Sequence, residues 1–364
     1  TYRRIADHLP SDSLCFFNQT RVVNARLRFR KPTGGQIEVF CLEPDESYPD
    51  VPTAMASSGS VLWKCMIGGA GKWKQGQVLT LELGDLVLNA GIAARQPGFF
   101  IVRLSWKPEG LSFAEVLEQA GTVPLPPYMQ READSNDTLR YQTVFSTSEG
   151  SVAAPTAGLH FTPGILDELA AKGIQPDFLT LHVGAGTFKP VKSATMEGHE
   201  MHAEWIEVSR TSIELLMNKN SGPVVAVGTT ALRTLESLYW IGAKLHAGIG
   251  VNFQGVAVEQ WDPYYDDSTC TLQESLTALM AYITENDLQK IITRTRIIIA
   301  PGYKMRVVSG LITNFHQPES TLLLLVAAHI GDDWHKVYDY ALQHRLRFLS
   351  YGDGSLLWGG VQNY

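Results

Sequence analysis

The stretch that decides the fold is Val224-Val-Ala-Val227, which continues through Gly228-Thr-Thr230 into the helix-like residues 231–240. Four apolar residues in a row predict a strand that is buried on both faces of a sheet. A buried strand that leads through a short turn into a helix is typical of an α/β domain. The turn is also a candidate anion site, because the first N–H groups of a helix have no partner within the helix.

Segments on either side of this unit fit the same architecture. Thr162 and Pro163 are favoured residues for the start of a helix, and the helix that they predict ends before Gly173. Apolar segments at 178–183 and 296–300 predict two more buried strands. Strands that alternate with helices indicate an α/β domain with a largely buried sheet.

The first third of the chain predicts a different kind of structure. Arg26-Leu-Arg-Phe-Arg30 alternates strictly, which predicts a strand with three arginines on one face. Residues 44–60 are expected to form a surface loop. Further strand-like pieces are separated by glycine-rich turns and lie at 61–67, 77–83, 85–94 and 98–106. Short strands joined by close turns predict a small barrel or sandwich.

Composition limits the class of protein. The chain has 364 residues, 45% of them hydrophobic and 18% charged, which is enough for a large core and two domains. Its four cysteines form no CxxC pair, so a disulfide scaffold or a zinc ribbon is not expected. The longest apolar run, residues 322–328, is far shorter than the roughly 20 residues that span a bilayer. With no signal peptide at the start, we expect a soluble cytoplasmic protein without a membrane partner.

Charge is distributed unevenly along the chain. The net charge of −7 argues against a polycation that coats nucleic acid. Residues 1–110 carry 13 Lys and Arg against 10 Asp and Glu, whereas the remainder carries 17 against 27. A polyanionic partner is therefore expected to favour the first third, where phosphates could contact the arginine face. A solvated strand face is the alternative interpretation of the residues concerned, which are Arg21, Arg26, Arg28, Arg30 and Lys31.

Four of the ten histidines fall between positions 160 and 202, in segments rich in Gly, Ala and Pro. Imidazoles exchange protons near neutral pH, so this clustering suits general acid–base catalysis. The alternative is that each histidine is a buried, hydrogen-bonded core residue. The four are His160, His182, His199 and His202.

A metal site is a second interpretation of the same region. His199 and His202 are three residues apart with Glu204 close by, and His160 or His182 could complete a zinc site through the fold. The spacing is not that of the H-E-x-x-H motif, because Ala203 stands where the second histidine would be needed.

Several polar or glycine-rich turns could contact a small ligand. Gly184-Ala-Gly186 with Thr187 lacks the third glycine and the helix of a dinucleotide loop, so it predicts only a tight turn that a ligand can approach. At the 228–230 turn, Thr229, Thr230 and Arg233 could hold a carboxylate or phosphate, and ordinary capping by Thr230 is the alternative. Weaker loop signals come from Asn314, His316, Tyr351 and Asp353.

These stretches together resemble the S-adenosylmethionine:tRNA ribosyltransferase-isomerase family of queuosine biosynthesis, from Arg3 to about Leu357. The motifs that carry the resemblance include Asn18-Gln-Thr-Arg21, Pro124-Leu-Pro-Pro-Tyr128, Ala153-Ala-Pro-Thr-Ala-Gly-Leu-His-Phe161, Leu181-His-Val-Gly-Ala-Gly-Thr-Phe188, His199-Glu-Met-His202, Ala226-Val-Gly-Thr-Thr230, Arg233-Thr-Leu-Glu-Ser237, Leu311-Ile-Thr-Asn-Phe-His316 and Ser350-Tyr-Gly-Asp353.

The resemblance implies a main α/β domain formed by residues 1–22 and 107–364, with a small antiparallel β-barrel domain inserted at 23–106. It also implies that the ribosyl part of S-adenosylmethionine moves to 7-aminomethyl-7-deazaguanine at the tRNA wobble position. Isomerisation then gives epoxyqueuosine and releases adenine and methionine. S-adenosylmethionine is thus the expected co-substrate and tRNA the expected partner, with no metal and a monomeric chain.

The residue roles that follow are hypotheses. The four clustered histidines are expected to supply the base and the acid, with Glu204 orienting one imidazole. The expected substrate-binding residues are Thr156, Gly158, Gly184, Gly186, Thr187, Gly228, Thr229, Thr230, Arg233, Asn314, His316, Tyr351 and Asp353. Departures from the family pattern, such as Gln19 and Gln317 where Asp and Leu are usual, allow a divergent paralogue with an altered substrate. A non-catalytic RNA-binding paralogue that keeps the arginine face is one alternative function. A metal-assisted hydrolase that uses His199, His202 and Glu204 is the other alternative.

Overall fold

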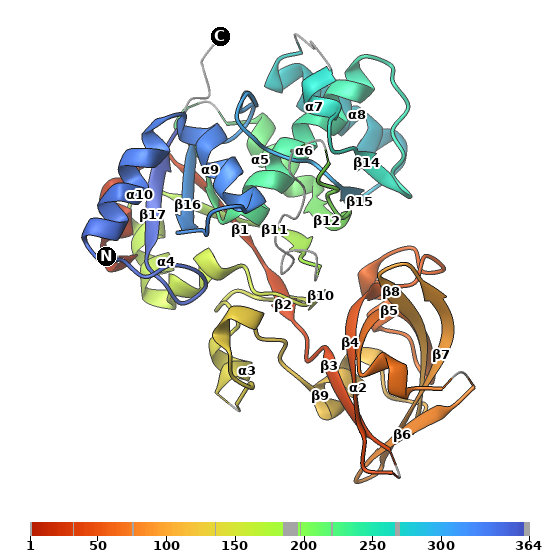
Figure 1. The fold of residues 1–364 in the computed structure, drawn as a ribbon. Coiled ribbons are helices and arrows are strands. Elements are labelled where there is room, and N and C mark those ends of the chain that lie inside the picture. Colours follow the sequence, from red (N-terminus) through yellow and green to blue (C-terminus); the bar gives the residue numbers. More distant parts are fainter. Residues whose placement is uncertain are drawn as a thin grey trace.

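A computed structural model describes residues 2–359 except 32, 75, 135, 185–195, 197, 220 and 266–269. In this structure the chain forms two large sheets (Figure 1), an eight-stranded mixed sheet and a seven-stranded antiparallel sheet that curls on itself, together with a two-stranded parallel pair. The chain therefore has a mixed α/β fold with a curled antiparallel sheet. Among the described residues, no helix is both long and apolar enough to cross a membrane.

The larger sheet has a parallel centre, antiparallel pairings on either side of it and one further parallel pair at one edge. Its strands, in spatial order, are β14 (Val256–Val258), β15 (Lys290–Thr295), β12 (Glu204–Ser209), β11 (Gln175–His182), β1 (Leu14–Asn18), β13 (Val224–Val227), β16 (Gly310–Asn314) and β17 (Gly354–Trp358). The expected strand at 224–227 is confirmed, and all four of its residues are buried. This pattern arises because helices cover both faces of the parallel strands.

Alternate side chains of the central strands enter two different cores. Leu14 and Phe16 of β1 pack with α5 (Arg210–Met217), α6 (Thr229–His246) and α8 (Leu272–Glu285) on one face. Cys15 and Phe17 pack on the other face with η1 (Tyr2–His8) and α4 (Pro163–Ala171). The helices α9 (Thr321–Ile330) and α10 (Asp333–Gln343) lie beside the β16–β17 end of the sheet (Figure 1).

Two local predictions about this sheet have different outcomes. The helix start at Thr162 is confirmed, because its side chain accepts from the N–H of Ile165 and α4 begins at Pro163. The strand expected at 296–300 is wrong, since the ladder strand is β15 at Lys290–Thr295. Residues 297–300 are buried but pair with no strand among the described residues, so their apolar run reflects core packing rather than sheet formation.

The smaller sheet is antiparallel throughout. Its strands, in spatial order, are β6 (Val78–Leu83), β7 (Leu86–Gln96), β8 (Phe99–Lys107), β5 (Ser60–Gly68), β4 (Gln36–Pro44), β3 (Arg26–Arg30) and β9 (Gly121–Thr122). The alternation in β3 is confirmed, with Leu27 and Phe29 fully buried. Because β9 pairs with β3, the sheet continues past residue 106, where we expected the smaller domain to end.

Short elements complete the smaller sheet and the junction between the two. The expected loop at 44–60 is partly wrong, because it contains α1 (Val51–Met55), which Asp50 caps and which buries Val51. The helix α2 (Phe113–Ala120) adds Phe113 to the core of the curled sheet. The remaining short elements are η2 (Ala70–Lys72), η3 (Pro127–Met129), α3 (Asp137–Arg140), η4 (Thr156–His160), α7 (Asp262–Tyr265) and the two-stranded pair β2 (Thr20–Val22) and β10 (Ser148–Ser151).

Two buried histidines are expected to make the fold sensitive to acid. Burial lowers the pKa values of His316 and His329 to about 4, below the value of about 6.5 in an unfolded chain. The folded state then binds fewer protons than the unfolded state between pH 4 and 6.5, so stability is lost as the pH falls through this window. We expect each histidine to cost about 2.5 kcal/mol of unfolding free energy by pH 4.5.

Urea unfolding at pH 7 and pH 4.5 checks this expectation. His329 has its Nε2 atom 3.2 Å from the carbonyl oxygen of Leu357, a bond that a glutamine amide can also donate. His329→Gln should therefore fold and show a smaller loss of stability on acidification than the parent chain. An unchanged pH dependence in His329→Gln would contradict the prediction.

Candidate active site

Four neighbouring parallel strands end along one edge of the larger sheet. The ladders that join them are all parallel, so the chain leaves each strand at the same edge. The final residues of β11, β1, β13 and β16 are His182, Asn18, Val227 and Asn314. Ligands of open α/β sheets bind outside the carboxyl ends of such strands. Sequence motifs far apart in the chain are therefore brought to one edge.

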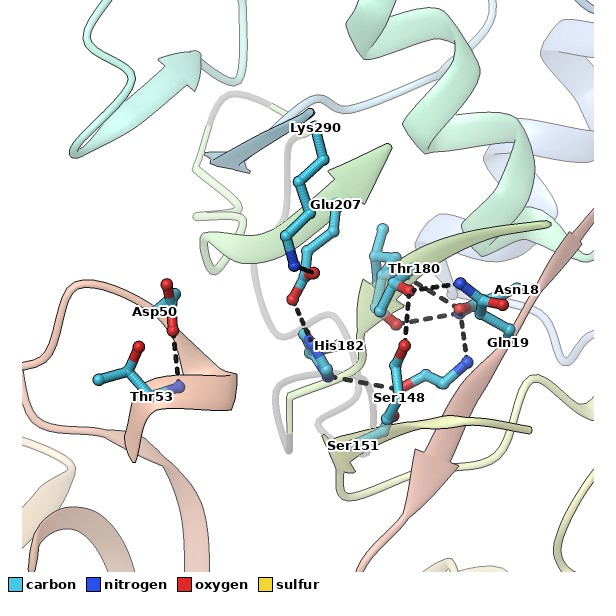
Figure 2. Close-up of polar contacts among 12 residues, drawn as sticks. Asn18, Gln19, Asp50, Thr53, Ser148, Ser151, Thr180, His182, Glu207 and Lys290 are labelled. Carbon is cyan, nitrogen blue, oxygen red and sulfur yellow. Dashed lines mark hydrogen bonds and ion pairs between the residues drawn. The ribbon is translucent and has the colours of Figure 1, made fainter. Parts of the chain in front are cut away.

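Both ring nitrogens of the buried His182 contact polar side chains (Figure 2). Its Nδ1 atom lies 3.3 Å from Oγ1 of Thr20, and its Nε2 atom lies 3.3 Å from Oε1 of Glu207. A carboxylate only accepts, so in the neutral ring Nε2 carries the proton and Nδ1 accepts from the Thr20 hydroxyl. With both nitrogens occupied, His182 holds strands together at the site edge.

The carboxylate that orients an imidazole is Glu207, not Glu204 as expected from the sequence. Burial would raise the pKa of Glu207, but hydrogen bonds from His182 and Lys290 outweigh burial and hold the pKa below its usual range. The Nζ atom of Lys290 lies 2.7 Å from Oε2 of Glu207. Sequence reasoning missed Glu207 and Lys290, although a glutamate inside the apolar strand Trp205-Ile-Glu-Val208 is an unusual residue that signals a buried partner.

Glu204 instead forms a buried ion pair with Arg233 of α6. The Nε atom of Arg233 donates to the carbonyl oxygen of Ile297 at 3.3 Å. Its Nη2 atom is buried and has no hydrogen-bond partner among the residues that the structure describes. Buried polar groups are rarely left unpaired, so a guanidinium with unused N–H groups is suited to bind an anion.

The helix α6 begins without a side-chain cap. Its N-cap residue is Gly228, whose φ of 94° is in a region that favours glycine. The alternative in which Thr230 caps the helix is wrong, because Oγ1 of Thr230 accepts a hydrogen bond of 3.2 Å from Nδ2 of Asn18. The start of α6 therefore offers backbone N–H groups one turn away from Arg233.

His160 lies at the end of η4, and its neighbours fix its tautomer. Oγ1 of Thr156 donates to Oδ1 of Asn314 at 2.8 Å, which directs Nδ2 of Asn314 toward Nε2 of His160 at 3.2 Å. An amide nitrogen only donates, so Nε2 accepts and Nδ1 carries the ring proton. Burial lowers the pKa of His160, and its ring stacks on Tyr2 with 4.1 Å between the centroids. His160 is thus a neutral ring with an N–H donor at Nδ1.

The other predicted ligand-binding residues of the C-terminal third differ in environment. His316 is buried just after β16, and its Nε2 lies 2.9 Å from Oγ1 of Thr313 in that strand. Asp353 accepts from the backbone N–H of Arg347 at 2.8 Å, which lowers the pKa of Asp353. Tyr351 is half-buried, and its hydroxyl has no partner within the described part of the chain.

Two of the glycines that were predicted to bind substrate lie where space is limited. A Cβ atom on Gly158 would come within 3.0 Å of side-chain atoms of Thr143 and Phe145. Gly184 lines a cavity of about 20 Å³ between the two sheets, next to His182 and Glu204, and this volume holds about one water molecule. Gly186 and Thr187 lie outside the described residues.

The segment before β12 carries the two remaining histidines. His202 is exposed and His199 is half-buried, and burial together with the neighbouring His202 lowers the pKa of His199. Within the described ranges, the donor atoms of His199, His202 and Glu204 do not gather into a three-ligand metal group. Because Glu204 is paired with Arg233, the metal-assisted hydrolase alternative has no support from the geometry.

Most of the predicted phosphate-binding side chains contact protein groups. Arg26 pairs with Glu38 at 2.6 Å, and Arg28 lies 3.6 Å from Glu38 and 3.1 Å from Glu132. Arg21 lies 3.5 Å from Glu149, and the Nζ atom of Lys31 donates to the carbonyl oxygen of Lys72 at 2.6 Å. Arg30 is exposed at the end of β3 and, with Arg28, lines a surface groove between β3 and β6.

The Glu38 pairs lead to a prediction about nucleic-acid affinity. Glu38→Gln frees Arg26 and Arg28 from a carboxylate, so we expect tRNA to bind about two- to fivefold more tightly, with a steeper dependence on salt concentration. Filter binding over a range of salt concentrations measures both quantities. Glu285→Gln, an exposed change on α8, controls for the altered net charge. Unchanged affinity in Glu38→Gln would mean that the arginine face does not contact tRNA.

Comparisons with known proteins agree with these motifs. The family model described as "Queuosine biosynthesis protein" matches residues 1–357. S-adenosylmethionine:tRNA ribosyltransferase-isomerase of Magnetococcus marinus is 36% identical over 360 residues, covering 98% of this chain and 83% of the relative. The protein of that name from Azoarcus sp. is 38% identical over 356 residues, covering 97% of this chain and 85% of the relative.

A crystal structure of S-adenosylmethionine tRNA ribosyltransferase from Thermotoga maritima is also similar, at 24% identity and a TM-score of 0.42, with 97% of this chain and 85% of that chain covered. The sequence matches alone are decisive, because they extend over nearly the whole chain. The chain belongs to the queuosine biosynthesis protein family, a family of enzymes whose relatives named here are S-adenosylmethionine:tRNA ribosyltransferase-isomerases.

Proposed function

We propose that this chain transfers and isomerises the ribosyl group of S-adenosylmethionine onto 7-aminomethyl-7-deazaguanine at the tRNA wobble position. The products are epoxyqueuosine in tRNA, adenine and methionine. The observation that carries the proposal is the set of family motifs at one sheet edge, where a neutral His160 and a partly unpaired Arg233 are found. We propose further that the enzyme acts as a monomer in the cytoplasm.

Arg233 and the start of α6 are proposed to bind the methionine carboxylate. The carboxylate would accept from Nη2 of Arg233 and from the backbone N–H groups at Thr229 and Thr230, near the positive end of the helix dipole. Glu204 keeps the guanidinium in place by its ion pair. A phosphate of tRNA is the alternative ligand for the same groups.

His199 is proposed to move the proton, and His160 to stabilise the departing adenine. The sulfonium acidifies the adjacent ribose carbon, and a neutral imidazole with a free lone pair can remove a proton from it. His199 has this character, because burial and His202 lower its pKa. The neutral His160 offers Nδ1–H, so it is suited to donate a hydrogen bond to the departing adenine, which takes its proton from the imidazolium that His199 has become. His182 has both nitrogens occupied and is a positioning residue.

The direct test is to incubate the full chain with S-adenosylmethionine and tRNA that carries the 7-aminomethyl-7-deazaguanine precursor. Chromatography should detect adenine and methionine, and mass spectrometry of digested tRNA should detect epoxyqueuosine. Mature tRNA without the precursor is the control and should give no adenine. Binding of precursor tRNA without adenine release would instead support the non-catalytic RNA-binding paralogue.

A further inference from the structure

A second group of metal-ligand side chains lies at the far end of α6 from the candidate active site. Within the described residues, one ring nitrogen of His246, the thiol of Cys270 and one carboxylate oxygen of Glu274 all lie within 4.8 Å of one another. His246 is the last residue of α6, and Thr230 lies in its first turn. At about 1.5 Å per residue the two are roughly 24 Å apart along the helix, so the group is separate from that site.

His246 and Glu274 lie on two tightly packed helices, and Cys270 lies just before the second of them. A Cβ atom on Gly242 would collide with Ser275, so α6 and α8 approach each other closely there. Oγ of Ser275 donates to the carbonyl oxygen of Tyr239 at 2.7 Å, and the Tyr239 hydroxyl donates to the carbonyl oxygen of Cys270 at 2.6 Å. Ligands on rigid, interlocked elements are held at fixed separations, which favours metal binding.

The carboxylate of Glu274 is also held in a fixed orientation. Oε2 of Glu274 accepts from the N–H and the hydroxyl of Thr271, each at 2.8 Å, in the capping box that starts α8. This arrangement leaves Oε1 available for another contact. The His246 and Glu274 side chains are exposed, whereas Cys270 is largely buried, so an ion would bind at the surface with its sulfur ligand on the inner side.

We propose that His246, Cys270 and Glu274 bind one zinc ion with a water molecule as fourth ligand. Imidazole and thiolate donors favour Zn²⁺ over Mg²⁺ or Ca²⁺, and one nitrogen, one sulfur and one oxygen ligand match common zinc coordination. On binding, the Cys270 thiol releases its proton to solvent, and the thiolate and carboxylate together balance the charge of the ion. The ion joins the end of α6 to the start of α8 and so stabilises the fold. The site does not take part in the proposed reaction.

Cobalt titration of the full-length, chelator-treated chain tests the site. Co²⁺ should bind one equivalent and give the near-ultraviolet band of a thiolate–cobalt bond, and Zn²⁺ should remove that band by competition. Cys270→Ser should abolish the band. Glu274→Gln should weaken binding at least tenfold, although glutamine still completes a capping box. Glu285→Gln, on the same helix and exposed, should bind like the parent chain.

Thermal unfolding gives an independent readout. Zn²⁺ should raise the Tm of the parent chain and of Glu285→Gln, but not that of His246→Ala or Cys270→Ser. Absence of the thiolate band in the parent chain would overturn the proposal, as would a band that persists in Cys270→Ser. Equal Zn²⁺ affinity in Glu274→Gln and the parent chain would remove Glu274 from the ligand set and contradict the site as proposed.

Discussion

His160→Ala is expected to lower the rate of adenine release from S-adenosylmethionine about 10²–10³-fold, the usual contribution of one hydrogen-bond donor to a developing negative charge. The reason is that His160 is held neutral by burial, with Nε2 accepting from Asn314 and the ring proton on Nδ1. Alanine removes that hydrogen-bond donor from the site edge. Single-turnover release of adenine at saturating S-adenosylmethionine and precursor tRNA measures the effect.

Matched variants separate the loss of this hydrogen bond from simple loss of packing. His160→Asn places an amide N–H near the position of Nδ1 and should restore much of the turnover, because an amide can donate the same hydrogen bond. Asn314→Asp, which offers oxygens where Nδ2 donated, should alter the pH profile of turnover. His344→Ala, an exposed change after α10, is the control. Turnover in His160→Ala within threefold of the parent value would exclude His160 as the hydrogen-bond donor to the departing adenine.

The second large effect concerns stability. Glu236 of α6 is fully buried, and its two carboxylate oxygens accept from the Tyr303 hydroxyl and from three successive backbone N–H groups, at 2.7–3.0 Å. Glu236→Ala leaves those donors buried without an acceptor. We expect the free energy of unfolding to fall by about 3–5 kcal/mol. Urea unfolding at pH 7 measures it.

Two further variants show how much of the stability loss in Glu236→Ala comes from individual hydrogen bonds. Tyr303→Phe removes one donor to Glu236 and also the acceptor of the Trp240 Nε1–H at 2.9 Å, so it should cost about 1–3 kcal/mol. Glu236→Gln keeps one carbonyl oxygen but turns an amide group toward an N–H donor, so its loss should be intermediate. Glu285→Ala on the exposed face of α8 should change stability little. A loss below 1 kcal/mol in Glu236→Ala would show that residues 306–308 do not depend on this carboxylate.

The sequence was sufficient to predict helices and strands that have a strong local sequence pattern. The capped helix after Thr162 and the alternating strand at 26–30 are confirmed, because each has a pattern specific to one kind of element. The strand at 224–227 is confirmed as well, and there the turn and helix that follow add to the apolar run. The strand expected at 296–300 is wrong because a run of buried apolar residues does not distinguish a ladder strand from a segment that fills the core. Hydrophobic periodicity reports burial rather than hydrogen bonding.

Less of the candidate active site could be predicted from the sequence, because its contacts join residues far apart in the chain. The histidines and the 228–230 turn could be named from residue type and spacing. Their partners could not: the pairing of His182 with Glu207, and of Glu204 with Arg233, follows from the register of β11 and β12 and from the packing of α6. The sequence likewise predicted that the arginines of β3 form an unpaired cationic face. It could not show that Glu38 of the neighbouring strand lies beside Arg26 and Arg28.

A crystal structure of the chain with S-adenosylmethionine tests the central claim most directly. We predict that the methionine carboxylate contacts Nη2 of Arg233 and the first turn of α6, and that the adenine lies within hydrogen-bond distance of Nδ1 of His160. Binding of the nucleoside on the curled antiparallel sheet, or with both of these groups out of contact, would contradict the assignment of this sheet edge as the active site.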